Sequence, residues 1–329
     1  MARWRRWRHW RKRKPQSGTN PGTTANPVRK TSRLKTYGKM VGVGGLIVSL
    51  WYGVESQLMR PGMSFEGVPK QHDFKLDLDF EIESDWFDRF STRVFRNEAY
   101  MVGYSEKLGN PLWVTYQVLP KPANTPRLPR PDRFNQDWRS ARCWLVLPCV
   151  EHEDYTASGY DRGHMAPNHV IATRYGQHAQ HQTFLMTNIT PQAPGLNRRA
   201  WQRLEEISAN YLAERYAPFT VITGPIFDKK PQFLPGYKMI AVPKAFYKIM
   251  IREDKNGGAP KVLAFVIPQT VFGNEDLSQF LTSVRDIERQ TGLDFFHELD
   301  DGVEAYVETL IDPQSWDFNQ RVATQSARY

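Results

Sequence analysis

Residues 184–205 read FLMTNITPQAPGLNRRAWQRLE, and the order of secondary-structure elements in this stretch indicates the fold. The run at residues 184–189 is typical of a strand, the Pro-containing residues after it predict a loop, and residues 196–216 have the pattern of a helix. Apolar side chains recur along that helix on one face, so we expect it to pack on a sheet through Leu196, Trp201, Leu204, Ile207 and Tyr211.

A mixed domain of strands and helices is expected from about residue 94 to the C-terminus. Further strand-like runs occur at residues 112–119, 219–223, 239–242, 246–251 and 262–267. A second helical pattern covers residues 274–291 and is closed by Gly292. The chain of 329 residues is long enough for one large domain with a buried core.

The N-terminal tail, residues 1–36, is basic and is expected to be disordered. Residues 1–35 hold 12 Lys and Arg and no acidic residue, which leaves 32 basic against 35 acidic residues in the rest of the chain. The net charge of +9 therefore describes the tail. It does not indicate a basic nucleic-acid groove on the folded domain.

Residues 37–59 are predicted to be a transmembrane signal anchor, because residues 40–54 carry no charge and lie between Lys39 and Glu55. A buried or interfacial helix is the alternative. The preceding basic residues favour a bacterial inner-membrane location with the domain on the periplasmic side. An Arg-rich start without acidic residues also suits a mitochondrial import signal. Residues 60–93 are interpreted as a linker, and residues 94–329 as the folded domain.

The only two cysteines of the chain, Cys143 and Cys149, are close in sequence. One disulfide closing a short loop and two half-buried thiols are both compatible with this spacing. The sequence leaves the choice open.

Among the eight histidines, His164 has the context best suited to chemistry. It ends the tetrapeptide DRGH, in which Gly163 permits close approach to a ligand and the charged neighbours can orient an imidazole or a phosphate. His178 and His181 would share one helix face. No third ligand follows at a diagnostic spacing, so this pair is interpreted as a solvated surface.

Asn197 and Glu205 are eight residues apart on the predicted helix, which is about 80° around its axis and about 12 Å along it. One hard cation could therefore bind the Asn197 carbonyl oxygen directly and meet Glu205 only through its water shell, as Mg²⁺ prefers. The alternative for Asn197 is a helix N-cap.

Taken together, the DRGH tetrapeptide, Asn188, Asn197 and Glu205 resemble the DNA/RNA non-specific endonucleases of the ββα-metal group. The resemblance extends to VITGP at residues 221–225, to VPKAFYK at residues 242–248 and to the pattern IExxTG at residues 287–292. It implies an α+β fold with a mixed, mainly antiparallel central sheet flanked by helices. It also implies a ββα-metal, or His-Me finger, active site.

The resemblance assigns a role to each matching residue. His164 would be the general base that activates water. Asn197 would be the only direct protein ligand of one divalent cation, Mg²⁺ or alternatively Mn²⁺, and Glu205 would contact that cation through water.

Four further residues are implicated in the same way. Asn188 would support the site, and Arg162 would act beside the general base in catalysis and substrate binding. An upstream arginine would contact the phosphate, for which Arg130 and Arg133 are both candidates and Arg130 is favoured.

The implied function is a metal-dependent endonuclease that hydrolyses phosphodiester bonds of DNA and RNA with little sequence preference and leaves 5′-phosphate ends. The alternative is a catalytically inactive, membrane-tethered nucleic-acid-binding module, which the complete set of polar residues disfavours. The expected partners are DNA, RNA, the membrane through the N-terminal segment, and a second copy in a homodimer. The sequence by itself fixes no oligomeric state.

Overall fold

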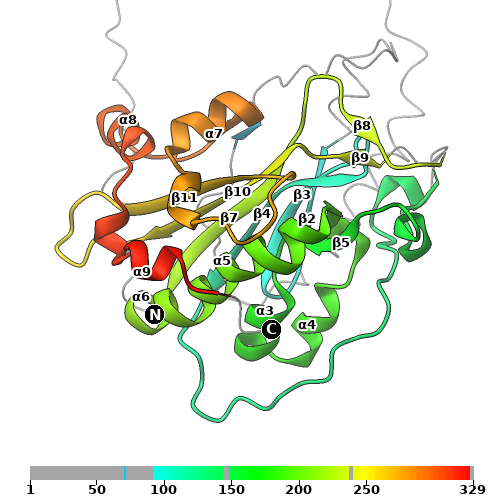
Figure 1. Ribbon diagram of the computed structural model, residues 1–329, viewed down its shortest axis with the longest axis horizontal. Coiled ribbons are helices and arrows are strands. Elements are labelled where there is room, and N and C mark those ends of the chain that lie inside the picture. Colours follow the sequence, from blue (N-terminus) through cyan, green and yellow to red (C-terminus); the bar gives the residue numbers. More distant parts are fainter. Residues whose placement is uncertain (1–69, 72–91, 144–147, 237–239, 327–329) are drawn as a thin grey trace, which may run out of the picture.

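A seven-stranded sheet forms the centre of the computed structural model, which describes residues 70–71, 92–143, 148–236 and 240–326 (Figure 1). The strand order is β12-β11-β10-β7-β4-β3-β2, and every neighbouring pair is antiparallel. The strands are β2 (Thr92–Arg96), β3 (Tyr100–Ser105), β4 (Asn110–Val118), β7 (Phe219–Ile226), β10 (Ala245–Arg252), β11 (Lys261–Pro268) and β12 (Leu281–Thr282). The expected α+β fold with a mainly antiparallel sheet is confirmed.

Helices cover both faces of this sheet (Figure 1). One face carries a long helix from Leu196 to Tyr216, which comprises a wide turn at Leu196–Trp201, α5 (Gln202–Glu206), a second wide turn at Ile207–Leu212 and α6 (Ala213–Tyr216). The same side holds α3 (Asn168–Tyr175), α4 (Gln177–Gln182) and α9 (Gln320–Ala323). The opposite face carries α7 (Val284–Thr291) and α8 (Asp301–Thr309).

Strand β10 contributes side chains to two hydrophobic cores, one on each face of the sheet. Successive side chains of a strand point to opposite faces. Phe246 and Met250 accordingly pack with the long helix, and Tyr247 and Ile249 pack in a second cluster with residues of α7 and α8. The predicted helix stripe is also confirmed, because Leu196, Trp201, Leu204 and Ile207 are buried in the first cluster and Tyr211 packs against it.

A separate two-stranded sheet lies beside the long helix. It pairs β5 (Asp161–His164) with β6 (Ile189–Gln192), so that Asp161 lies opposite Gln192 and His164 opposite Ile189. The chain then enters the long helix at Leu196. Two other small sheets pair β8 (Gln232–Phe233) with β9 (Ala241–Val242), and β1 (Lys70–Gln71) with β13 (Leu293–Asp294).

The strand predicted at residues 184–189 is wrong in position. Residues Met186–Asn188 form a 3-10 turn, and the strand follows at Ile189–Gln192. The cause is Asn188, whose side chain bonds to the backbone of Ala166 and Thr183 and so favours a turn over a strand ladder.

The helix predicted at residues 274–291 is shorter than expected. A 3-10 turn at Leu277–Phe280 and strand β12 precede α7, whose start is set by Ser283, because its side chain accepts a hydrogen bond from the Asp286 amide. The end at Gly292 is confirmed, with a left-handed φ of 69°.

The predicted tail and anchor, residues 1–36 and 37–59, lie outside the described residues. In the part of the chain that the structure describes, no helix is both long and apolar enough to cross a membrane. Of the predicted linker at residues 60–93, Lys70–Gln71 and the first two residues of β2 are described, and they belong to sheets. Cys143 and Cys149 form a disulfide, which resolves the choice left open by the sequence.

Candidate active site

The frame of the candidate site consists of β5, β6 and the first turns of the long helix. Gly163 is required in β5 because the Gln192 side chain of β6 crosses it. A Cβ at residue 163 would come within 2.1 Å of the Gln192 Oε1 atom. A glycine therefore lets the two strands hold His164 and Asp161 at opposite ends of a short, tightly packed pair.

Asn188 fastens the segment that follows His164. Its Oδ1 accepts a hydrogen bond from the Ala166 amide at 2.8 Å, and its Nδ2 donates to the carbonyl oxygens of Ala166 and Thr183 at 3.1 and 2.9 Å. The side chain is completely buried. The structure thus places Asn188 beneath the site, with its amide fully used by the backbone.

The His164 ring packs in a cluster with two phenyl rings, which also contact each other. The ring centroids of Phe134 and Phe184 are 5.2 and 4.9 Å from that of His164. Its Nε2 is buried and has no hydrogen-bond partner among the described residues. Burial, followed by the positive charge of Arg130, lowers the pKa of His164 to about 3, so the imidazole is neutral at pH 7.

Arg130 and Arg133 differ in what they face. Arg130 stacks over the Phe184 ring at 5.4 Å, and its charge lowers the pKa of both His164 and Glu205. Arg133 is exposed and paired with Glu153 at 2.5 Å. Of the two candidate arginines, the structure brings Arg130 to the site.

Asn197 is oriented by Asp161. Its Nδ2 donates to the Asp161 Oδ2 at 2.9 Å. A carboxylate only accepts hydrogen bonds, so this contact fixes which end of the amide faces Asp161. The Asn197 Oδ1 therefore points away from the carboxylate, and no described residue donates to it. The N-cap alternative is wrong, because Gly195 precedes the helix and Asn197 lies in its first turn.

Asp161 also binds the next residue of the helix. Arg198 donates to both carboxylate oxygens, with Nε at 2.8 Å from Oδ2 and Nη2 at 2.6 Å from Oδ1. Burial alone would raise the pKa of Asp161, but the hydrogen bonds from Arg198 and Asn197 outweigh it and lower the pKa. Asp161 is thus held as an anion, which keeps the Asn197 amide in one orientation.

Glu205 and Lys248 are two buried ionisable groups under the site, and each affects the pKa of the other. Burial raises the pKa of Glu205 to about 7, while Lys248, the indole of Trp201 and Arg130 lower it. The Trp201 N–H approaches the carboxylate without a full hydrogen bond, and the Glu205 Oε1 is buried with no partner in the described chain. Lys248 comes from the middle of β10 and is completely buried, with its Nζ 4.5 Å from the centroid of the Trp201 ring.

The wide turn at the start of the long helix affects the spacing of the site residues. In a regular helix, residues 197 and 205 would be about 80° apart around the axis. A wide turn takes up an extra residue of about 100°, which changes the offset to about 20° in the opposite sense. Asn197 and Glu205 therefore lie closer to one face of the helix than regular geometry predicts.

Arg162 is placed differently from the sequence-based expectation. Its Nε and Nη2 donate to the His152 carbonyl oxygen at 2.9 and 2.6 Å, and Nη2 also donates to the Thr156 hydroxyl at 3.0 Å. Two of its three nitrogen atoms thus hold the 3-10 turn His152–Tyr155 against β5. The expected phosphate contact of Arg162 gains no support from this arrangement.

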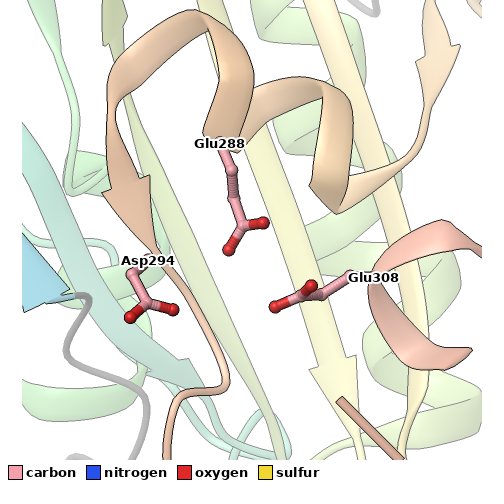
Figure 2. A group of neighbouring side chains, drawn as sticks. All are labelled: Glu288, Asp294 and Glu308. Carbon is pink, nitrogen blue, oxygen red and sulfur yellow. The ribbon is translucent and has the colours of Figure 1, made fainter. Parts of the chain in front are cut away.

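A second group of carboxylates lies on the other face of the sheet (Figure 2). Glu288, Asp294 and Glu308 have oxygen atoms within 4.8 Å of one another. Glu308 is buried and paired with Arg285, and burial and the nearby Glu288 raise its pKa to about 8. Glu288 accepts a hydrogen bond from the Phe295 amide at 2.8 Å. A retained proton and Arg285 balance much of this charge, so we interpret the group as a structural link between α7, β13 and α8.

Comparison with known proteins identifies the chain. The sequence model of the DNA/RNA non-specific endonucleases matches residues 81–302. The chain belongs to this family. It is a nuclease that hydrolyses phosphodiester bonds, which confirms the predicted enzyme class. The family depends generally on a divalent cation.

Several named relatives of this nuclease are mitochondrial. Human "Endonuclease G, mitochondrial" is 32% identical over 210 residues, which are 60% of this chain and 67% of the human protein. The "Mitochondrial nuclease" of Saccharomyces cerevisiae is 29% identical over 222 residues, covering 61% and 65% of the two chains. The "Nuclease" of a Nostoc species is 30% identical over 222 residues, covering 65% and 76%.

A solved structure has the same fold. A chain from the crystal structure of the EndoG/EndoGI complex matches with a TM-score of 0.54 and 28% identity, over 63% of this nuclease and 86% of that chain. The match supports the arrangement of the sheet and its flanking helices described above.

Two residues of the site were not singled out by the sequence. Lys248 was visible only as a lysine inside the apolar run at residues 246–251, and that unusual position was the available signal for a buried charge. Asp161 was expected to orient His164 or a phosphate. In the structure it accepts a hydrogen bond from Asn197 and orients that residue instead. His178 behaves as expected of a surface residue, because it is exposed and paired with Glu98.

Proposed function

We propose that this nuclease cleaves DNA and RNA with little sequence preference, using His164 as general base and Asn197 as the protein ligand of one divalent cation. The observation that carries the proposal is the pairing of Asn197 with Asp161 on the strand that ends in His164. It leaves one amide oxygen free on the same β5–β6–helix unit that holds a neutral imidazole.

The donor set fits a hard, hydrated cation. Asn197 offers a carbonyl oxygen, and Glu205 offers a carboxylate oxygen that is buried without a partner in the described structure. Oxygen ligands with most positions left to water are what Mg²⁺ prefers, and Mn²⁺ accepts similar ligands. When bound, the cation would supply charge neutralisation at the phosphate.

The protein residues supply the rest of the chemistry. His164 is neutral because of its low pKa, so its ring is available to take a proton from the attacking water at pH 7. Arg130 is exposed beside His164 and Glu205 and would bind the scissile phosphate. Asn188 and Arg162 are positioning residues in this proposal, since their side chains hold the backbone on either side of His164.

Binding through phosphate explains tolerance of sequence and sugar, because phosphate contacts carry no base information. Ends with a 5′-phosphate remain part of the proposal through the family resemblance. The mitochondrial names of the human and yeast relatives support the mitochondrial alternative for the location of this chain. The inner-membrane anchor at residues 37–59 remains a prediction without support from the described residues.

The test compares the full-length protein with His164→Ala and with a matched control, His178→Ala, which changes an exposed histidine of α4. Supercoiled plasmid and RNA are incubated with Mg²⁺, with and without a chelator, and binding is measured separately with a labelled oligonucleotide. We expect His164→Ala to lose cleavage by a factor of about 10² to 10⁴ while binding persists, and the control to cleave normally. Full cleavage by His164→Ala, or cleavage that is insensitive to the chelator, would refute the assignment.

A further inference from the structure

An open groove adjoins the start of the long helix, next to the Asp161–Asn197 pair. Its volume is about 510 Å³. Two chain segments form its walls, the residues that lead into the helix and the loop after β11. The lining consists of Ala193, Pro194, Gly195, Arg198, Arg199 and residues 269–272.

Arg198 connects this groove to the candidate site. The residue lines the groove, and its guanidinium binds both oxygens of Asp161, which in turn orients Asn197. A polymer bound at Asn197 would therefore pass close to the groove.

Phe272 is presented at the groove with most of its ring in solvent, since 79% of the residue is exposed. A single exposed aromatic residue is ordinary on a protein surface. The backbone under this one, however, is firmly held. The Glu275 carboxylate accepts hydrogen bonds at 2.7 Å from the amides of Phe272 and Gly273.

The loop of Phe272 is also packed closely on the helix. Gly273 has a φ of +104°, and a Cβ there would come within 2.2 Å of the Arg199 Cβ. The Arg199 Nη1 donates to the Phe272 carbonyl oxygen at 3.3 Å. The exposed ring thus stands on a rigid turn directly beside an arginine.

The ionisable side chains that line the groove are basic. Its lining includes two arginines and no acidic residue. Arg198 is paired with Asp161, but Arg199 has no carboxylate partner anywhere in the described ranges. A flat aromatic ring next to an unpaired guanidinium matches the two parts of a nucleotide, a base with a π face and a phosphate.

We propose that this groove binds the nucleotide next to the scissile phosphate, with its base stacked on Phe272 and its backbone phosphate on Arg199. The proposal rests on the proposed function, because the groove is defined relative to a phosphate bound at Asn197. A paired base offers no free face to a side chain, so the contact applies to single-stranded DNA and RNA and to frayed ends.

The test measures binding without cleavage. Full-length protein in a chelator is titrated into a fluorescein-labelled single strand of 12 nucleotides and into a closed hairpin duplex, and Kd is read from fluorescence anisotropy. The variants are Phe272→Ala, Phe272→Leu, Phe272→Trp and Arg199→Ala. The control is Tyr306→Ala, which removes an exposed aromatic ring from α8 on the other face of the sheet.

Stacking predicts a specific order of affinities. Phe272→Ala and Phe272→Leu should weaken binding of the single strand by about 5-fold or more, and the duplex by less, whereas Phe272→Trp should bind as well as the wild type. Arg199→Ala should reduce the slope of log Kd against log salt concentration by about one. Tyr306→Ala should leave Kd unchanged.

Two outcomes would overturn the groove proposal while leaving the nuclease assignment intact. These are a Phe272→Ala protein that binds the single strand within two-fold of the wild type, and equal losses for single strand and duplex. A wild-type protein that binds neither nucleic acid would instead count against the proposed function itself.

Discussion

Replacing Asp161 by asparagine tests the orientation of Asn197 with almost no change in shape. The wild-type carboxylate accepts from the Asn197 Nδ2 at 2.9 Å and cannot donate, so it selects one of the two amide orientations. A hydrogen bond to a charged group contributes about 1.5–3 kcal/mol. That corresponds to a roughly 10- to 150-fold preference for the orientation that leaves the Asn197 Oδ1 free.

The Asp161→Asn variant loses this preference, because its own amide can donate to the Asn197 Oδ1 and occupy it. Since the Asp161 side chain is only 16% exposed, water replaces the lost contact poorly. We expect the affinity for Mg²⁺ or Mn²⁺ to fall about 10- to 100-fold, the range typical when a residue that orients a metal ligand is changed.

Two measurements check this expectation. The Mg²⁺ dependence of plasmid cleavage gives the concentration for half-maximal activity, and Mn²⁺ binding to the metal-free protein is followed directly by electron paramagnetic resonance. Arg198→Met serves as the control, because it removes the other partner of Asp161 and leaves the Asn197 contact in place; it should shift metal affinity less than about three-fold. A metal affinity that Asp161→Asn leaves unchanged would refute the reasoning.

Three further changes probe the surroundings of the site. Lys248→Met removes one of two interacting buried groups and should lower the free energy of unfolding, because the Glu205 carboxylate stays buried without its cation. It should also move the pH–rate profile upward, because Glu205 loses a cation that lowers its pKa; an unmoved profile would contradict this. The pKa of Glu308 is raised to about 8, so its contribution to stability is present at low pH and lost as the pH rises from about 4.5 through 8. Glu308→Gln should therefore gain thermal stability relative to the wild type across that pH range. A difference in Tm between variant and wild type that does not change with pH would count against this. Asn188→Ala leaves three backbone groups of Ala166 and Thr183 unpaired and should cost on the order of 3 kcal/mol in urea unfolding; a loss below about 1 kcal/mol would be too small for that role.

The elements that sequence reasoning placed well are those in which periodicity and packing agree. The long helix has an apolar stripe that matches its buried face, and the runs at residues 112–119, 246–251 and 262–267 lie in central strands of the sheet. Strands β2 and β3 were missed. All six residues of β3 are buried, so the alternation that marks a half-exposed strand is absent there.

The residues around the candidate site were harder to predict, because their roles depend on contacts between distant segments. Arg162 lies in the same tetrapeptide as His164, but its partner His152 is ten residues away and not apparent from any motif. Arg130 and Arg133 are equivalent in spacing, and only the folded chain distinguishes them, since Glu153 pairs with Arg133. Sequence pattern identifies residue types suited to a reaction, whereas tertiary contacts decide which of them are free to take part.

The aromatic rings packed against His164 have a consequence for repeated turnover. Phe134 and Phe184 pack against the imidazole and against each other, so rotation of the imidazole about its last side-chain bond would disturb this aromatic cluster. The alignment of the proton acceptor is therefore established once, when the chain folds, and each new substrate meets it already aligned. The entropy lost in ordering this ring is offset by hydrophobic packing during folding, and not by the free energy of nucleic-acid binding.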